Sequence, residues 1–424
     1  MSRTFSSLSI PNYRSFFMGN CASNLGLWMT RTAQSWLVLE VLTQGDATAL
    51  GWLTTMMFLP TLLLTPLAGI LADKFPKRTI MLLAQGLLFV DILILSTLTL
   101  THHVQLWHVF VLALLDGVAG AFDGPSRQSI VTELVPVTEV SNAIGLNSTA
   151  WNSARLLGPG AAGVLIGLIG TGPVFVVNAF TYVAQVVALL SLDRTSMIRP
   201  AVIKTEKAKF LPAVRYVASR PLLLILFVIA LAMGAFGFNQ SVTNPLMTTD
   251  AFGKGATEFG LLGSVMGIGS LVAALLAARR PRPRIRHVVV GLGVFAIAMA
   301  FSAMAPTFLI FALLQIPMGL AGVQVMTTAN AIVQVSVSAQ LRGRVMALWV
   351  AVVMGLTPIV SPVVGWVGSA YGARATVWFN TFWVIVAFVV SSVYLYTRGG
   401  IELHMSRQRP WVDVQPRTEP GHAG

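Results

Sequence analysis

Long apolar runs, broken by short polar segments, dominate this chain from about residue 15 to residue 397. Many of them reach the roughly 18 apolar residues that a helix needs to cross a bilayer. Backbone groups in lipid must bond within their own segment, so such spans are helical. The ten-residue alternation of a membrane β-barrel does not occur in the sequence. The pattern predicts twelve transmembrane helices, at about 15–41, 48–72, 79–100, 105–125, 141–169, 173–192, 221–246, 258–278, 288–304, 307–335, 344–369 and 375–397.

The twelve predicted spans form two sets of six, separated by a basic segment that contains two prolines. An internal repeat supports this division, since Gly117, Gly120 and Gly163 recur as Gly319, Gly322 and Gly365 at one constant spacing. We expect an all-α membrane protein with twelve transmembrane helices in two pseudo-symmetric six-helix bundles. The expected domains are an N-terminal bundle at 1–192, a cytoplasmic linker at 193–220, a C-terminal bundle at 221–397 and a cytoplasmic tail at 398–424.

Charged residues make up 10% of the chain, against about 25% in soluble proteins. The net charge is +13. If the N-terminus is cytoplasmic, the predicted outer loops hold only Lys254 and Arg374, and most other basic residues lie inside. This positive-inside distribution predicts that both termini are cytoplasmic. Nucleic acid is excluded as a partner, because no polar segment is long enough to form a basic soluble module.

Recognisable catalytic chemistry does not occur in the sequence. It contains no metal-ligand spacing, no nucleophile–base arrangement and no G-x-x-x-x-G-K-[ST] phosphate loop. We therefore expect no enzyme activity, no metal, no cofactor and no direct use of ATP. Cys21 is the single cysteine, so no disulfide forms within the chain. The polar N-terminus leading to Arg14 does not resemble a removable signal peptide.

The short connection between spans 2 and 3 reads G-I-L-A-D-K-F-P-K-R, from Gly69 to Arg78. It resembles the loop between helices 2 and 3 of major facilitator superfamily transporters, whose pattern is G-x-L-A-D-[RK]-x-G-[RK]-[RK]. Pro76 replaces the second glycine of that pattern. The resemblance extends over roughly residues 10–397 and implies two bundles that alternate access to a small-molecule site between them.

Span 5 carries a second resemblance, to the helix-5 signature of the exporters of this superfamily. The matching positions are Gly145, Ala154, Gly158, Pro159 and Gly163, with alanine in place of the signature glycines at positions 154 and 162. Small residues at this spacing let two helix backbones approach closely, and Pro159 can bend the helix. The family carries the signature mainly in antiporters, which favours export. The alternative is a general packing seam of small residues.

Within the superfamily, the chain resembles the bacterial exporter branch that includes enterobactin and macrolide efflux proteins. The resemblance rests on Pro11-Asn12-Tyr13-Arg14, Asp123-Gly124-Pro125-Ser126-Arg127 and Leu341-Arg342-Gly343-Arg344-Val345. It implies a monomeric, proton-coupled exporter of a small amphipathic organic compound, drug-like or siderophore-like, in the bacterial plasma (inner) membrane. The alternatives are an importer or lipid transporter of the same fold, or a non-transporting membrane sensor or assembly protein.

Four charged residues lie near the centres of predicted spans: Arg31, Asp91, Asp116 and Arg155. Each costs at least about 2.5–3.5 kcal/mol to insert, so such residues usually face a partner or a water-filled space. We expect Asp116 to load and release the coupled proton, with Arg31 or Arg155 as its partner or as a contact for an anionic substrate group. A permanent structural pair is the alternative. Asp91, on the peripheral span 3, suits a local hydrogen bond or a wet crevice.

The resemblance also implies a conformational latch at the cytoplasmic face, made by Gly69, Asp73, Lys74, Lys77, Arg78 and Asp123. Asp73 is expected near the N-terminal end of span 11, where the helix dipole favours an anion. The basic residues are expected to pair with Asp123. These contacts would hold the outward-open state. The alternative is that the basic residues only keep the loop inside.

Further polar or aromatic residues within the spans are candidates for the wall of a substrate cavity, although most such residues serve helix–helix hydrogen bonding. They are Asn24, Gln34, Asn147, Asn239, Gln240, Asn244, Gln315, Gln324, Asn330 and Trp349. The sequence has no dense cluster of amides and acids of the kind that suits a sugar. An amphipathic or aromatic substrate fits these positions better.

Overall fold

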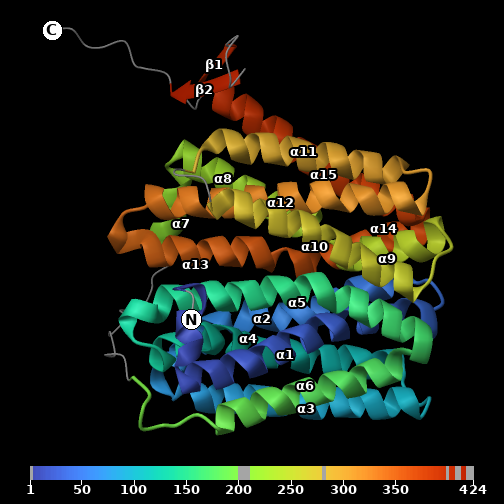
Figure 1. The fold of residues 1–424 in the computed structure, drawn as a ribbon. Helices are drawn as coiled ribbons and strands as arrows, with labels where there is room; N and C mark the ends of the chain where they lie inside the picture. The colour runs from blue at the N-terminus through green and yellow to red at the C-terminus, as the bar shows by residue number, and fades with distance from the viewer. Residues whose placement is uncertain (1–2, 199–210, 279–282, 398–400, 406–411, 417–424) are drawn as a thin grey trace.

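A computed structural model of the chain describes residues 3–198, 211–278, 283–397, 401–405 and 412–416. Its long helices lie nearly parallel to one another in two stacked groups (Figure 1). The helices α1–α6 form the lower group in that view, and α8–α15 form the upper group. The short helix α7 lies within the segment predicted as a linker.

The N-terminal group consists of η1 (Arg3–Ser9), α1 (Pro11–Trp36), η2 (Leu37–Leu42), α2 (Ala47–Lys74), α3 (Lys77–Leu100), α4 (Leu106–Leu134), η3 (Val137–Glu139), α5 (Val140–Ile169) and α6 (Thr171–Leu190). The remaining elements are α7 (Leu211–Ala218), α8 (Pro221–Ala232), η4 (Met233–Gly237), α9 (Gln240–Leu246), η5 (Met247–Ala251), α10 (Ala256–Ala278), α11 (Ile285–Met304), α12 (Phe308–Ser336), α13 (Ala339–Gly355), α14 (Thr357–Tyr371), α15 (Ala373–Thr397), β1 (Ile401–Met405) and β2 (Val412–Pro416). The segments η2, η4 and η5 are π-helical turns. The strands β1 and β2 pair antiparallel within the predicted tail.

Within the described residues, eleven helical segments are long and apolar enough to cross a membrane. The first predicted span is not among them, because α1 carries many polar side chains. Asn20 and Asn24 are nevertheless buried, since α1 packs along α5 and α6 inside the N-terminal group. The helix α1 therefore corresponds to the first predicted span and completes the expected set of twelve, with its polar face turned away from lipid. Large apolar side chains such as Leu83, Phe180 and Leu309 are exposed instead, as a lipid-facing surface requires.

The two groups contact each other along α2 with α14 and along α5 with α10. We call the end that carries Asp46, Lys254 and Gly372 the Asp46 end, and the opposite end, with Lys77, the Lys77 end. Close to the Asp46 end, a Cβ on Gly365 would lie 2.4 Å from the carbonyl oxygen of Ala47. The backbones therefore meet directly, which only glycine permits at this position.

The same helices leave open space toward the Lys77 end. A Cβ added to Gly69 on α2, or to Gly145 on α5, would meet nothing within 4 Å. On α5, by contrast, a Cβ on Gly163 would lie 2.6 Å from the carbonyl oxygen of Ala256 and 2.8 Å from the Cα of Gly260. The close backbone contacts between the groups thus lie toward the Asp46 end, whereas Gly69 and Gly145, nearer the Lys77 end, have open space beside them.

Candidate transport site

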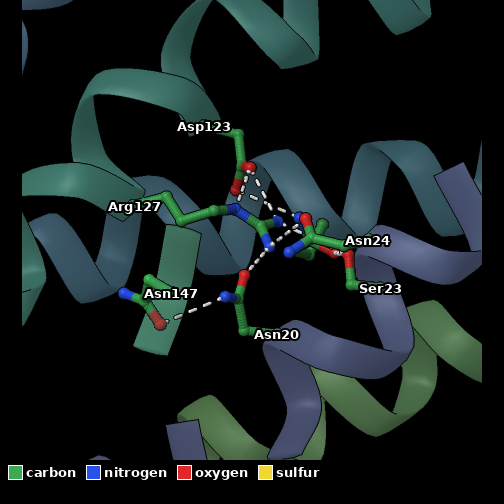
Figure 2. Close-up of polar contacts among 7 residues, drawn as sticks. Asn20, Ser23, Asn24, Asp123, Arg127 and Asn147 are labelled. Carbon is green, nitrogen blue, oxygen red and sulfur yellow. Dashed lines mark hydrogen bonds and ion pairs between the residues drawn. The ribbon is translucent and has the colours of Figure 1, made fainter. Parts of the chain in front are cut away.

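Arg127 lies at the centre of a polar network inside the N-terminal group (Figure 2). Its Nε donates to Asp123 Oδ2 over 2.8 Å, one helical turn earlier on α4. Its other nitrogens donate to Asn20 Oδ1, to Asn24 Oδ1 over 3.5 Å and to the hydroxyl of Ser23 over 3.4 Å, all on α1. The side chains of Arg127 and Asp123 are only 15% and 11% exposed, so this pair is largely removed from water.

Two further helices join this network. On α3, Gln85 donates to Asp123 Oδ1 over 3.0 Å and accepts from Ser23 over 3.3 Å. On α5, Asn147 Oδ1 accepts from Asn20 and from the hydroxyl of Tyr13, each over 3.4 Å. The network therefore holds α1, α3, α4 and α5 in one arrangement. Charge-assisted bonds of this kind are the stronger ones in proteins.

The expected pairing of Lys77 and Arg78 with Asp123 is not formed in this conformation. Lys77 forms an ion pair with Glu133, and Arg78 donates to the carbonyl oxygens of Leu189 and Leu190. The reason lies in the length of α4, which continues to Leu134 rather than ending near residue 125. Glu133 is thereby at the Lys77 end of the helix, while Asp123 lies deeper, beside Arg127. Lys74 is exposed, and the side chain of Asp73 lies outside the described part of the structure.

The charged residues predicted within the spans gather in one region of the N-terminal group. Arg31 on α1 and Asp116 on α4 are both half-buried, and they interact electrostatically. Asp91 on α3 also interacts with Asp116, and Arg155 on α5 interacts with Arg31. Asp91 is 3% exposed, and its Oδ1 has no hydrogen-bond partner in the described structure. We call Arg31, Asp91, Asp116 and Arg155 the charged cluster.

Aromatic rings cover the two arginines of the charged cluster. The guanidinium carbon of Arg31 lies 5.3 Å from the ring centroids of both Trp28 and Phe58. That of Arg155 lies 5.8 Å from the ring of Trp28. Cation–π contacts of this length are favourable. Trp151 packs edge-on against Trp28, with 5.7 Å between centroids, and is 39% exposed. The cluster is therefore lined by aromatic surface and remains partly accessible.

The small residues of span 5 make close helix contacts at three of the predicted positions. Gly158 lies against α1, where an added Cβ would be 2.6 Å from the Cβ of Trp28. Pro159 and Gly163 lie against Gly260 of α10. Ala154 is buried, whereas Gly145 has open space beside it. The contacts therefore join α5 both to its own group and to the other one.

The candidates for a substrate cavity do not come together at one place. Asn24 and Asn147 belong to the Arg127 network, while Gln34 is buried and neither atom of its amide group has a partner in the described structure. In the C-terminal group, one small hollow is lined by Asn239, Gln240, Asn244 and Gln315. Gln324 donates to the carbonyl oxygen of His287, and Trp349 packs against Phe227 with 4% exposure. These last two residues are thus engaged in helix packing.

Sequence reasoning missed the central role of Arg127 and the contacts of Asn20, Ser23 and Gln85. One signal was present, because Asp123 and Arg127 are four residues apart and therefore adjacent on a helix. It was hidden by ending span 4 before Arg127. Among the described residues, no group of three His, Cys, Asp or Glu side chains is arranged to hold a metal ion.

A polar contact joins the two groups at the Asp46 end. Asp46 Oδ1 accepts from the backbone N–H of Thr48 over 2.8 Å and from the hydroxyl of Ser369 on α14 over 2.7 Å. Thr48 also donates to Ser369 through its backbone N–H and its hydroxyl. Partial burial raises the pKa of the Asp46 carboxyl, but the hydrogen bonds from Ser369 and Thr48 outweigh it and hold the pKa below its usual range.

Acid is expected to loosen this contact. Closure lowers the pKa of Asp46, so the ionised carboxylate stabilises the closed Asp46 end. This stabilisation is fully present above the ordinary carboxyl pKa and is lost as the pH falls through the lowered value. The test uses Ala47→Cys, a buried interface position, in a Cys21→Ser background, with Lys254→Cys as the exposed reference. Relative to that reference, labelling at position 47 should be faster at about pH 3 than at about pH 7.

The matched variant Asp46→Asn carries no titratable group at this position. In this background, the normalised labelling rate should be the same at both pH values. A pH response of equal size in Asp46→Asn would assign the effect to another group and contradict the prediction.

A family model described as transmembrane secretion effector matches residues 2–415 of this chain. The chain belongs to this family. It is 26% identical over 265 residues to the staphyloferrin A transporter of Staphylococcus aureus. This alignment covers 62% of the chain and 65% of the relative, slightly less than two thirds of its length.

Other relatives align over different shares of the chain. The multidrug efflux pump Tap of Mycolicibacterium fortuitum is 26% identical over 371 residues, which are 83% of this chain and 88% of the relative. An uncharacterised MFS-type transporter of Bacillus subtilis, YfiS, is 27% identical over 270 residues, which are 61% of each chain. The predicted superfamily is confirmed: this is a multi-pass membrane protein of the major facilitator superfamily, and the relatives it matches are transporters rather than enzymes.

Solved structures agree on the fold. The nucleoside transporter NupG superposes with a TM-score of 0.71 at 13% identity, covering 92% of this chain and 100% of NupG. A bacterial homologue of the human lysosomal transporter Spinster, in an inward-facing and occupied conformation, has a TM-score of 0.70 at 15% identity, covering 91% and 97%. The predicted two-bundle, all-α fold is therefore confirmed for this member of the family.

Proposed function

We propose that this protein is a proton-coupled exporter of a small amphipathic organic compound in the inner membrane of a bacterium, and that it acts as a monomer. The observation that carries the proposal is the charged cluster, in which Asp116 interacts with both Arg31 and Asp91. A carboxyl group among other charges changes its proton affinity when its surroundings change. Alternating access supplies such a change in each transport cycle.

Relatives support the direction of transport. They include a transporter of staphyloferrin A and an efflux pump for multiple drugs. The small-residue contacts of α5 fit the exporter signature, since Gly158 and Gly163 both allow close approach of a neighbouring helix. An export cycle requires the two groups to close alternately at either end, and the contact of Gly163 with α10 provides one such closure.

We further propose that the Lys77 end faces the cytoplasm, in accord with the positive-inside distribution of Lys and Arg. Closure at the Asp46 end then makes this conformation inward-facing. The latch predicted from Gly69, Asp73, Lys74, Lys77, Arg78 and Asp123 belongs to the opposite, outward-facing state. This assignment accounts for the open space beside Gly69 in the present conformation.

Proton flux in energised, inverted membrane vesicles tests the proposal. A pH-sensitive dye inside the vesicles would report the gradient while drugs, macrolides and siderophores are added one at a time. At least one compound should dissipate the gradient in vesicles with the native protein. Asp116→Asn should reduce that flux to the level of empty vesicles, because its amide does not ionise and cannot load and release a coupled proton.

The matched control is Glu40→Gln, which removes a carboxyl group from η2, beyond the end of α1, and should leave the flux unchanged. Flux that persists in Asp116→Asn would contradict the role of Asp116. Transport of a compound by the native protein without any proton movement would contradict proton coupling itself.

A further inference from the structure

The charged cluster contains more hydrogen-bond donors than partners. Arg31 and Arg155 form neither of the two ion pairs found among the described residues, and neither guanidinium donates a hydrogen bond there. Each guanidinium carries five N–H groups in a planar fork. The indole Nε1 of Trp28, whose ring lies within about 6 Å of both guanidinium carbons, is buried and also lacks a partner in the described structure. Three donor groups around one ring thus form no hydrogen bond in the described structure.

For the buried indole Nε1 of Trp28 this arrangement is costly unless a ligand completes it, whereas the half-buried guanidinium groups stay accessible to such a ligand. A polar group that is removed from water without a hydrogen bond costs about 1–3 kcal/mol, and more when it is charged. The two guanidinium groups also repel each other. Asp116 attracts Arg31 electrostatically, but it lies beyond ion-pair distance, since neither of the ion pairs in the described structure includes it. An anion between the arginines would relieve both costs.

We propose that Arg31 and Arg155 bind an anionic group of the transported compound, and that the substrate is an organic acid with an aromatic or flat apolar body. This inference deepens the proposed function and rests on it. A carboxylate matches the guanidinium fork through two parallel hydrogen bonds. The rings of Trp28, Phe58 and Trp151 supply flat apolar surface beside the charged group.

The position of the cluster suits a transported ligand rather than a permanent one. Arg31, Arg155 and Trp28 are all half-buried, so they are accessible from outside the protein interior. Trp28 also packs against Gly158 of α5. Gly158 lies about one turn from Gly163, which contacts α10. A ligand held by α1 and α5 is therefore adjacent to the interface between the two groups.

A set of three naphthalene compounds tests the sign of the charge that the site prefers. We would titrate the purified full-length protein with 2-naphthoate, 2-naphthamide and 2-naphthylmethylammonium, which share one ring system and carry a negative, a neutral and a positive group. Charge-assisted hydrogen bonds should make the dissociation constant for naphthoate at least about tenfold lower than that for the amide. The ammonium compound should bind most weakly.

Two variants localise the effect. Arg31→Gln and Arg155→Gln should each remove the preference for naphthoate over the amide, whereas Arg374→Gln should retain it. Arg374 is the matched control, because it is engaged with the carbonyl oxygens of Ala303 and Ala305 and with the ring of Phe252, far from the cluster in sequence. If a glutamine variant fails to fold, Arg155→Lys replaces it, since lysine keeps the charge but loses the two-pronged contact.

The results separate this inference from the proposed function. Equal binding of the three compounds, preference for the ammonium compound, or no binding at all would overturn the anion site. Preference for naphthoate that survives both Gln variants would overturn the role of the arginines. Anion-selective binding without proton exchange in vesicles would support the anion site and contradict proton coupling. Proton exchange driven only by cationic compounds would support proton coupling and contradict the anion site.

Discussion

Replacing Arg127 by methionine should lower the free energy of unfolding by about 3–5 kcal/mol, because it leaves a largely buried carboxylate without its partner. Asp123 is 11% exposed and would retain only Gln85 as a side-chain donor. Asn20 and Asn24 would lose their charged donor at the same time. The measurement is unfolding of the purified protein in mild detergent, followed by circular dichroism.

Two further variants test the cause of this loss. Arg14→Met removes an arginine from the exposed start of α1 and should change the free energy of unfolding by less than about 0.5 kcal/mol. The double variant Asp123→Asn with Arg127→Met should recover part of the loss, since no unpaired charge remains. Stability of Arg127→Met equal to that of Arg14→Met would show that the network does not stabilise the fold.

Replacing Gly163 by valine should block closure at the Asp46 end and abolish most transport. The new Cβ would lie 2.6 Å from the carbonyl oxygen of Ala256 and 2.8 Å from the Cα of Gly260, and backbone atoms cannot move aside as flexible side chains do. Overpacking of this kind costs about 1–3 kcal/mol. Applied to closure alone, that cost shifts the conformational equilibrium by a factor of about 5–150.

Gly145→Val is the matched control, on the same helix and in the same predicted signature. Its Cβ meets nothing within 4 Å, so transport should be near normal. In the Ala47→Cys, Cys21→Ser background, labelling of position 47 should rise in Gly163→Val and stay low in Gly145→Val. Equal loss of transport in the two valine variants, with position 47 still protected, would contradict a role in closure.

The sequence predicts the helical fold well because lipid imposes length and hydrophobicity on each span. It is least informative for α1, whose polar side chains serve neighbouring helices rather than lipid. The partners of individual charges are harder to predict, because they depend on where each helix ends. Span 4 was predicted to end too early, and this alone made Asp123 the expected partner of Lys77 in place of Glu133.

The gathering of Arg31, Asp91, Asp116 and Arg155 was predictable only in part. Each residue is conspicuous as a charge in an apolar run, but Asp91 was expected to act locally on a peripheral helix. Its interaction with Asp116 depends on the rotation of α3 against α4, which periodicity does not specify. The contact of Asp46 with Ser369 likewise depends on how the two groups meet, and no local pattern encodes it.

The π-helical turns η2, η4 and η5 have a consequence for how these helices move. They lie at the end of α1 and on either side of α9. A π turn contains one residue more than the α-helical turn it replaces. Shifting that extra residue along the chain would rotate the side chains it passes by about 100°, the angle between neighbouring residues of an α-helix. A change of helical register, in which few backbone hydrogen bonds are exchanged, can thus present different side chains to a passing solute while the bundle keeps its outline.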